Sequence, residues 1–265
     1  MQERLTQGVI CSKDNHNFIY KIAKIDYTEY ENGEYSYSFT PFYNVIDMLP
    51  SSIFQGIPGL NLSVRKAVYT RKNIVPTFVS ERTPGENREN LYELLAECGM
   101  DFLNRLEWLI RTKTHYCGDN LFVKRFEPAD DGVTIRSNSM YDLVAQPAQL
   151  NKKLLEIICY GDNLVTKEIV IDDSNRAEHY NFLMPLYLNA LQNKKQAQQA
   201  GINRCKTQGG FGGRARLQLD ELELQTTLTE FAEGRINEET ALERLKVSHS
   251  TFFRRLREFR AKARK

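Results

Sequence analysis

The sequence has little of what metal-binding and disulfide-stabilised proteins require. Its five cysteines are odd in number and widely spaced, without a Cys-x-x-Cys pair, and its four histidines are equally scattered. This spacing argues against a disulfide framework and against a zinc site. Neighbouring acids such as Asp130 and Asp131, or Asp172 and Asp173, are typical of turns. We therefore expect no bound metal and no cofactor.

Long apolar runs and a large net charge are also missing. No segment approaches the roughly 18 apolar residues of a membrane-spanning helix, and the opening MQERLTQGVICSKDN lacks the apolar core of a signal peptide. The formal net charge of the 265 residues is +2, so no overall field attracts the chain to nucleic acid or membrane. With 41% hydrophobic residues, we expect a soluble cytoplasmic protein of one or two domains.

The charge that is present is concentrated at the C-terminal end. Residues 246–265 contain eight basic side chains and one acidic one, Glu258, which amounts to +7 in 20 residues. Because the whole chain carries +2, the remaining residues sum to −5. Such an asymmetry predicts an anionic partner for the C-terminal part.

The first 180 residues mix strand and helix patterns. The Asn32-Gly33 turn signal between tyrosine-rich flanks predicts a β-hairpin over 25–40. Alternation between strands and helices favours an α/β or α+β domain, which we divide into a strand-rich segment at 1–65 and a domain at 66–180. The other patterns predict strands at 17–26, 73–80, 118–127 and 164–172, and helices at 86–97, at 100–112 and within 146–161.

Three features follow in order. Residues 176–208 have the pattern of one long helix that is apolar only in its first half, and we assign 181–208 as a linking helix through which the protein dimerises. The glycine-rich stretch GGFGGRARLQL, at 209–219, predicts a flexible basic arm. Residues 220–265 predict a small all-α domain of three helices, at 220–234, at 237–245 and after Ser248.

This order, together with the residues GGRARLQ…EETALERLKVSHSTFFRRL, resembles the C-terminal DNA-binding region of the resolvase/invertase serine recombinases. The resemblance covers about 185–260 and includes VSHSTFFR at 247–254, which is similar to the family's recognition helix. It implies a helix-turn-helix that binds double-stranded DNA, preceded by an arm that lies in the minor groove.

The resemblance also implies roles for individual residues. Arg214 and Arg216 belong to the arm, and arginines in a narrow A·T-rich minor groove meet enhanced negative potential. Ser250, Thr251 and Arg254 match the positions that face the major groove. We assign contacts with phosphates, which provide affinity rather than sequence choice, to Ser248, Arg255, Arg257, Arg260 and Lys262.

The catalytic domain of that family is not evident in the sequence. The segment 78–101, FVSERTPGENRENLYELLAECGMD, is similar to the family's first strand-helix unit, with Ser80 and Arg82 as the candidate catalytic residues. In that register, however, the nucleophile position holds Arg82 and the usual arginine position holds Ser80. The front domain is therefore interpreted as a decayed catalytic domain or as an unrelated one.

We interpret the chain as a sequence-specific DNA-binding protein of a bacterial or phage mobile element. It would be a homodimer that acts as a regulator or as an accessory factor in site-specific recombination, without cleaving DNA itself. Two alternatives stay open. One is a divergent but active serine recombinase with Ser80 as nucleophile. The other is a protein-interaction module that is anchored to DNA by its tail and binds a recombinase or integrase.

Overall fold

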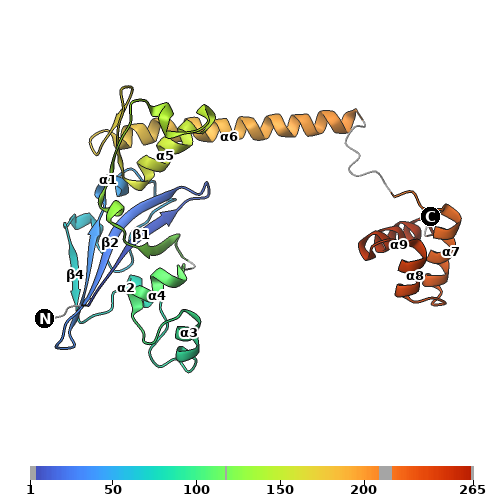
Figure 1. Cartoon of the computed structure of the whole chain (residues 1–265), viewed down its shortest axis with the longest axis horizontal. Helices are drawn as coiled ribbons and strands as arrows, with labels where there is room; N and C mark the ends of the chain where they lie inside the picture. The colour runs from blue at the N-terminus through green and yellow to red at the C-terminus, as the bar shows by residue number, and fades with distance from the viewer. Residues whose placement is uncertain (1–3, 117, 209–216, 264–265) are drawn as a thin grey trace. The chain divides into compact units, whose positions relative to one another are not determined.

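A computed structural model of the protein describes residues 4–116, 118–208 and 217–263 (Figure 1). The chain divides into two compact units, Met1–Lys195 and Gln196–Lys265. The first unit contains strands and helices, then comes a long helix, and the described C-terminal residues form helices. This confirms the fold class that the sequence predicts.

The first unit contains all the strands of the described chain. The strands are β1 (Arg4–Lys13), β2 (Ile19–Glu29), β3 (Tyr35–Pro41), β4 (Tyr69–Lys72), β5 (Leu121–Arg125), β6 (Thr134–Arg136), β7 (Asn163–Val165) and β8 (Val170–Ile171). The α-helices are α1 (Tyr43–Ile46), α2 (Thr77–Ser80), α3 (Leu91–Glu97), α4 (Arg105–Thr112), α5 (Leu150–Tyr160) and the start of α6 (Arg176–Thr207).

A five-stranded antiparallel sheet forms the centre of the first unit, with the strand order β4-β3-β2-β1-β5. The predicted hairpin is confirmed, with Tyr27 opposite Tyr37 and a positive φ of 80° at Gly33 in the turn. The edge strand β5 pairs with β1, and Val123 lies opposite Ile10. Because the sheet takes strands from both 1–65 and 66–180, the expected boundary between these ranges does not separate two folding units.

Helices cover this sheet and complete the hydrophobic core. Helix α4 contacts β1 and β5, and α5 contacts β2 (Figure 1). A smaller sheet of order β6-β7-β8 lies in the same unit. Side chains from every layer are fully buried in one continuous core, among them Ile10, Ile25, Phe39, Leu106 and Ile158.

Several predictions of local structure are wrong. Residues 73–80 do not form a strand, because Pro76 starts the short helix α2 at Thr77. The predicted strand at 164–172 is split into β7 and β8, which pair with each other. The predicted helix at 86–97 begins only at Leu91, and the one at 100–112 only at Arg105. Strand β1 was not predicted, although it lies between β2 and β5.

Helix α6 confirms the predicted long helix. Its first turns pack into the core of the first unit through Tyr180, Leu183 and Met184, whereas Phe182 and Leu186 are exposed. From 191 to 208 nearly all side chains are exposed. Within the described ranges, none of the helices combines the length and the apolar character that a membrane span requires.

The C-terminal unit contains the three predicted helices, α7 (Glu221–Ala232), α8 (Glu238–Leu245) and α9 (His249–Ala263). Asp220 caps α7, accepting a hydrogen bond of 3.0 Å from the backbone NH of Glu223, and Asn237 caps α8 with one of 2.9 Å from Thr240. A small apolar core joins the helices and buries Leu224, Leu228, Ala241, Leu245, Phe252 and Leu256.

Candidate nucleic-acid interface

A tight turn joins α8 to α9. Lys246, Val247 and Ser248 form it, and Lys246 adopts the left-handed conformation with φ of 50°. The carbonyl oxygen of Ser248 then accepts hydrogen bonds from the backbone NH groups of Thr251, at 2.9 Å, and Phe252, at 3.0 Å. These bonds start α9 directly after the turn. Helices α8 and α9 are therefore consecutive helices joined by a three-residue turn.

Helix α9 has a buried side and a polar side. Phe252 and Leu256 are buried, and the Phe252 ring packs edge-on against Phe231 with 5.1 Å between ring centroids. Ser250, Arg254 and Arg257 are exposed and recur at spacings of four and three residues, so they share one face of the helix. We call these three residues the α9 polar face. Packing of the aromatic side therefore determines which side chains α9 presents to solvent.

Residues at the start of α9 border this polar face. The Ser248 hydroxyl lies 3.2 Å from that of Ser250 and 3.1 Å from that of Thr251, which is half-buried. His249 was not among the predicted site residues. Its Nε2 lies 3.1 Å from a carboxylate oxygen of Glu238, and its ring packs against Phe253 at 4.5 Å between centroids. His249 thus connects the start of α9 to α8. In the sequence, its position directly after Ser248 in VSHSTFFR could have marked it as a site residue.

Charge is separated among the three helices. The segment 217–232, which includes α7, has four acidic side chains and no basic one. Helix α9 instead has five basic side chains and one acidic one, Glu258. Helix α9 is therefore net positive and the segment with α7 net negative.

The other predicted contact residues differ in where they lie. Arg260 is exposed on α9, in keeping with an accessible cation. Arg255 is only 13% exposed in its side chain, and its Nη2 donates a hydrogen bond of 3.1 Å to the backbone carbonyl of Leu217. Arg214 and Arg216 lie outside the described residues, as does the side chain of Lys262.

The two catalytic candidates lie at the end of α2 in the first unit. The Ser80 hydroxyl donates a hydrogen bond of 3.2 Å to the carbonyl of Thr77. Arg82 is 3% exposed, donates a bond of 3.0 Å to the carbonyl of Phe78 and forms an ion pair with Asp119. A guanidinium that is buried and paired in this way is not accessible to a phosphate group.

The first unit also contains a buried group of charges. The Asp130 carboxylate accepts hydrogen bonds from Lys124 Nζ at 2.7 Å and from the Tyr160 hydroxyl, and Lys21 Nζ donates to the Asp130 carbonyl oxygen at 2.7 Å. Burial opposes ionisation of Asp130, but the bonds from Lys124, Tyr160 and the backbone NH of Glu127 outweigh it, so the pKa of this carboxyl lies below its ordinary value. These groups satisfy one another, which indicates a structural role.

Acid is expected to remove the stability that Asp130 contributes. Its pKa is depressed in the folded state, so the contribution is complete above the unfolded pKa of about 3.9 and disappears as the pH falls through the folded value. We expect Asp130→Asn to destabilise the first unit at neutral pH, with a difference from wild type that shrinks below about pH 4. Urea unfolding at neutral pH and below about pH 4, followed by the fluorescence of Trp108, measures the difference in unfolding free energy between the variant and the wild type. The exposed neighbour Asp131, changed to Asn, is the control, and a pH-independent difference would contradict the expectation.

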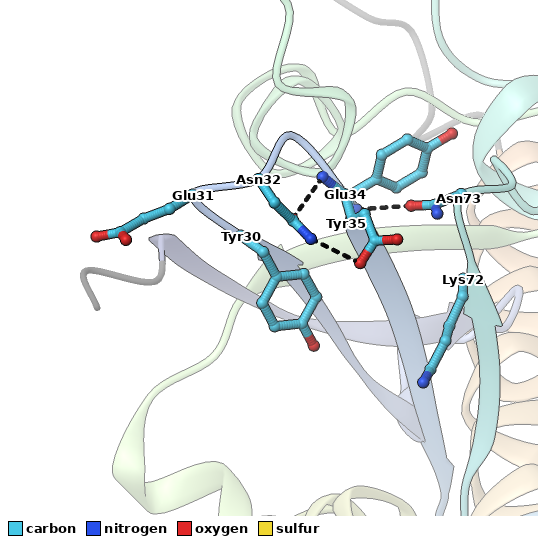
Figure 2. Close-up of a pocket in the computed structure, with 7 residues that line it drawn as sticks. All are labelled: Tyr30, Glu31, Asn32, Glu34, Tyr35, Lys72 and Asn73. Atoms are coloured by element: carbon cyan, nitrogen blue, oxygen red, sulfur yellow. Dashed lines mark hydrogen bonds between the residues drawn. The ribbon is translucent and has the colours of Figure 1, made fainter.

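A pocket of about 590 Å³ lies at the turn of the β2–β3 hairpin, and its seven lining residues are drawn in Figure 2. Two lining residues are already engaged, since Glu34 accepts a bond of 2.9 Å from Asn32 and Asn73 accepts one of 2.8 Å from the backbone NH of Tyr35. No serine, cysteine or histidine is among the seven residues drawn there. Among the described residues of the whole chain, no group of His, Cys, Asp and Glu side chains is arranged to hold a metal ion.

Comparison of the chain with protein-family models, with curated proteins and with solved structures gave no match. The function of the C-terminal unit is therefore inferred from its own residues and geometry.

Proposed function

We propose that this protein binds double-stranded DNA in a sequence-specific manner and reads it with α9. The α9 polar face, Ser250, Arg254 and Arg257, carries this proposal because it is exposed on a helix that follows a tight turn. An α-helix fits the major groove of B-DNA, where an arginine contacts a guanine edge through two hydrogen bonds. Thr251 borders the face and adds a hydroxyl for a base or a phosphate.

Further contacts would fix the position of α9 on the duplex. Arg257, Arg260, Ser248 and Lys262 are assigned to phosphates, which hold register without reading sequence. Arg214 and Arg216 precede the three helices and are assigned to the adjacent minor groove, as in the recombinase family that the C-terminal sequence resembles.

A dimer is part of the same proposal. Phe182 and Leu186 lie four residues apart on α6, are 66% and 44% exposed, and so form an apolar patch on one face of that helix. A two-fold dimer reads two inverted half-sites. The biological role that fits is a regulator or recombination accessory factor of a bacterial or phage mobile element, with a recombinase or integrase as a further partner. The alternative of an active recombinase has less support, because the guanidinium of Arg82 is buried.

Selection of duplexes from a random DNA pool by the full chain tests this function. We expect one enriched motif that contains two inverted half-sites, with centres about 10 base pairs apart or a multiple of that. Enrichment of a single half-site would contradict the dimer, and a pool without enrichment would contradict sequence-specific binding.

Replacing Arg254 is expected to relax specificity as well as affinity. If Arg254 contacts a base edge, Arg254→Ala should cost about 1–3 kcal/mol of binding free energy on the selected site, with lost discrimination at one position. Arg257→Ala should instead weaken binding to all duplexes alike and reduce the slope of log affinity against log salt by about 1. Titration of labelled duplexes at several salt concentrations measures both effects. Arg235, an exposed arginine outside α9, changed to Ala is the control and should keep wild-type affinity.

A further inference from the structure

Arg255 differs from the other arginines of α9 because its guanidinium is bonded within the protein. Its Nη2 donates to the carbonyl of Leu217 at 3.1 Å, and its Nη1 lies 3.5 Å from a carboxylate oxygen of Glu258. The side chain is 13% exposed, whereas Arg254 and Arg257 are exposed. A charge in this position is poorly placed to attract a phosphate, because it already has an anionic neighbour and little contact with solvent.

The position of Arg255 on the helix explains this contact. With about 3.6 residues per turn, Arg255 lies between the α9 polar face and the buried side that holds Phe252 and Phe259. Together with Glu258, it lines a groove whose other wall is α7, including Leu224 and Leu228. From this side of α9 the long side chain of Arg255 reaches Leu217, in the segment that leads into α7.

Three residues of that segment are held in place. Arg255 binds the backbone at Leu217, Leu219 packs against the core of the three helices, and Asp220 caps α7. Arg216 is the residue immediately before Leu217. The point at which the chain enters the three-helix unit is therefore tied to α9 itself.

We propose that Arg255 is a positioning residue that holds the backbone at Leu217 against α9, and so couples the contacts of Arg214 and Arg216 to those of the α9 polar face. This rests on the proposed DNA-binding function and replaces the assignment of Arg255 to a phosphate. Groups that are held in one relative geometry bind a rigid duplex with less loss of conformational freedom than groups that move independently. Arginine suits the role because its planar fork donates in two directions, which a lysine does not do.

The anchoring itself is tested without DNA, by hydrogen exchange of the full chain. Arg255→Ala should speed exchange of the Glu223 and Leu224 amides, which bond to Asp220 beside the anchored segment, on the order of tenfold, while the amides in the middle of α9 keep their protection. Arg255→Lys should recover only part of the protection. Unchanged exchange at Glu223 and Leu224 would overturn the proposal, whatever the protein does with DNA.

The coupling is tested by a double-mutant cycle in the full chain, on the DNA site that the wild type selects. Arg255→Ala should lower affinity roughly tenfold in the wild-type background and have almost no effect in the Arg214→Ala/Arg216→Ala background. Arg257→Ala is the comparator, since a direct phosphate contact should cost the same factor in both backgrounds.

Two results would contradict the coupling and can be told apart. Equal loss from Arg255→Ala in both backgrounds, with a salt slope reduced by about 1, would return Arg255 to the phosphate contacts. Failure of the wild type to select any DNA would instead remove the proposed function, and the exchange measurement would still show whether Arg255 anchors Leu217.

Discussion

Leu256→Ala is expected to unfold residues 217–263 and leave the first unit folded. Leu256 is 2% exposed in a core of only six buried apolar side chains among the described residues of the C-terminal unit. Truncating a buried leucine to alanine costs about 2–5 kcal/mol, and a single core of this size rarely supplies more than about 3–5 kcal/mol. The loss is therefore comparable to the whole stability of the three helices.

Hydrogen exchange of the full chain, read segment by segment, measures this effect. In Leu256→Ala the amides of α7, α8 and α9 should lose protection, those of β1 and β2 should keep it, and binding to the selected DNA should be lost. Leu222→Ala is the matched control, since it makes the same chemical change on α7 at a side chain that is 78% exposed. Full protection of α9 in Leu256→Ala would mean that contacts other than this core hold the helices together.

Arg176→Met is expected to destabilise the first unit by about 3 kcal/mol or more. The Arg176 side chain is fully buried at the start of α6. Its guanidinium donates to the carbonyl of Asp162 at 2.6 Å and to the side-chain oxygen of Asn163 at 2.7 Å, and it pairs with Asp173 at 3.1 Å. Methionine fills most of the same volume, but it leaves the carbonyl of Asp162 and the side-chain oxygen of Asn163, both half-buried, without this donor.

Trp108 is the only tryptophan of the chain and lies 8% exposed in the core of the first unit, so its fluorescence reports unfolding of that unit. Urea unfolding of Arg176→Met should show a lower midpoint with an unchanged slope. Arg65→Met is the matched control, because Arg65 forms a bidentate ion pair with Asp47 on the surface, and exposed pairs contribute little. Equal destabilisation by the two substitutions would contradict a special role for the buried arginine.

Local sequence patterns were sufficient for the three C-terminal helices. The spacing of Leu228 and Phe231, and that of Phe252 and Leu256, with cap residues such as Asn237, predicts the three helices, and α7, α8 and α9 lie where the patterns place them. Leu222, expected on the same face as Leu228, is instead 78% exposed. This works because the 3.6-residue period and the caps are properties of neighbouring residues. For the same reason the long helix and the β2–β3 hairpin were predictable.

Long-range pairing could not be predicted in this way. Strand β1 was missed although it forms a hairpin with β2 across residues 14–18, and its second partner, β5, lies more than a hundred residues further along the chain. The alternation of apolar residues at 164–172 predicts one strand, because it does not reveal the turn between the two short strands β7 and β8. Of these pairings, only that of β1 with β5 joins segments that no local window contains, since β7 and β8 are joined by a short turn.

The sequence by itself determined that the chain ends in a basic helix behind a tight turn, with Ser250, Thr251 and Arg254 at its start. Only the tertiary structure decided which arginines are accessible. Arg254 and Arg257 face solvent, Arg82 and Arg176 are buried in the first unit, and Arg255 holds the backbone at Leu217. The physical reason is that an arginine's charge and reach are properties of the residue, whereas its partner is whichever acceptor the rest of the fold brings within hydrogen-bonding distance.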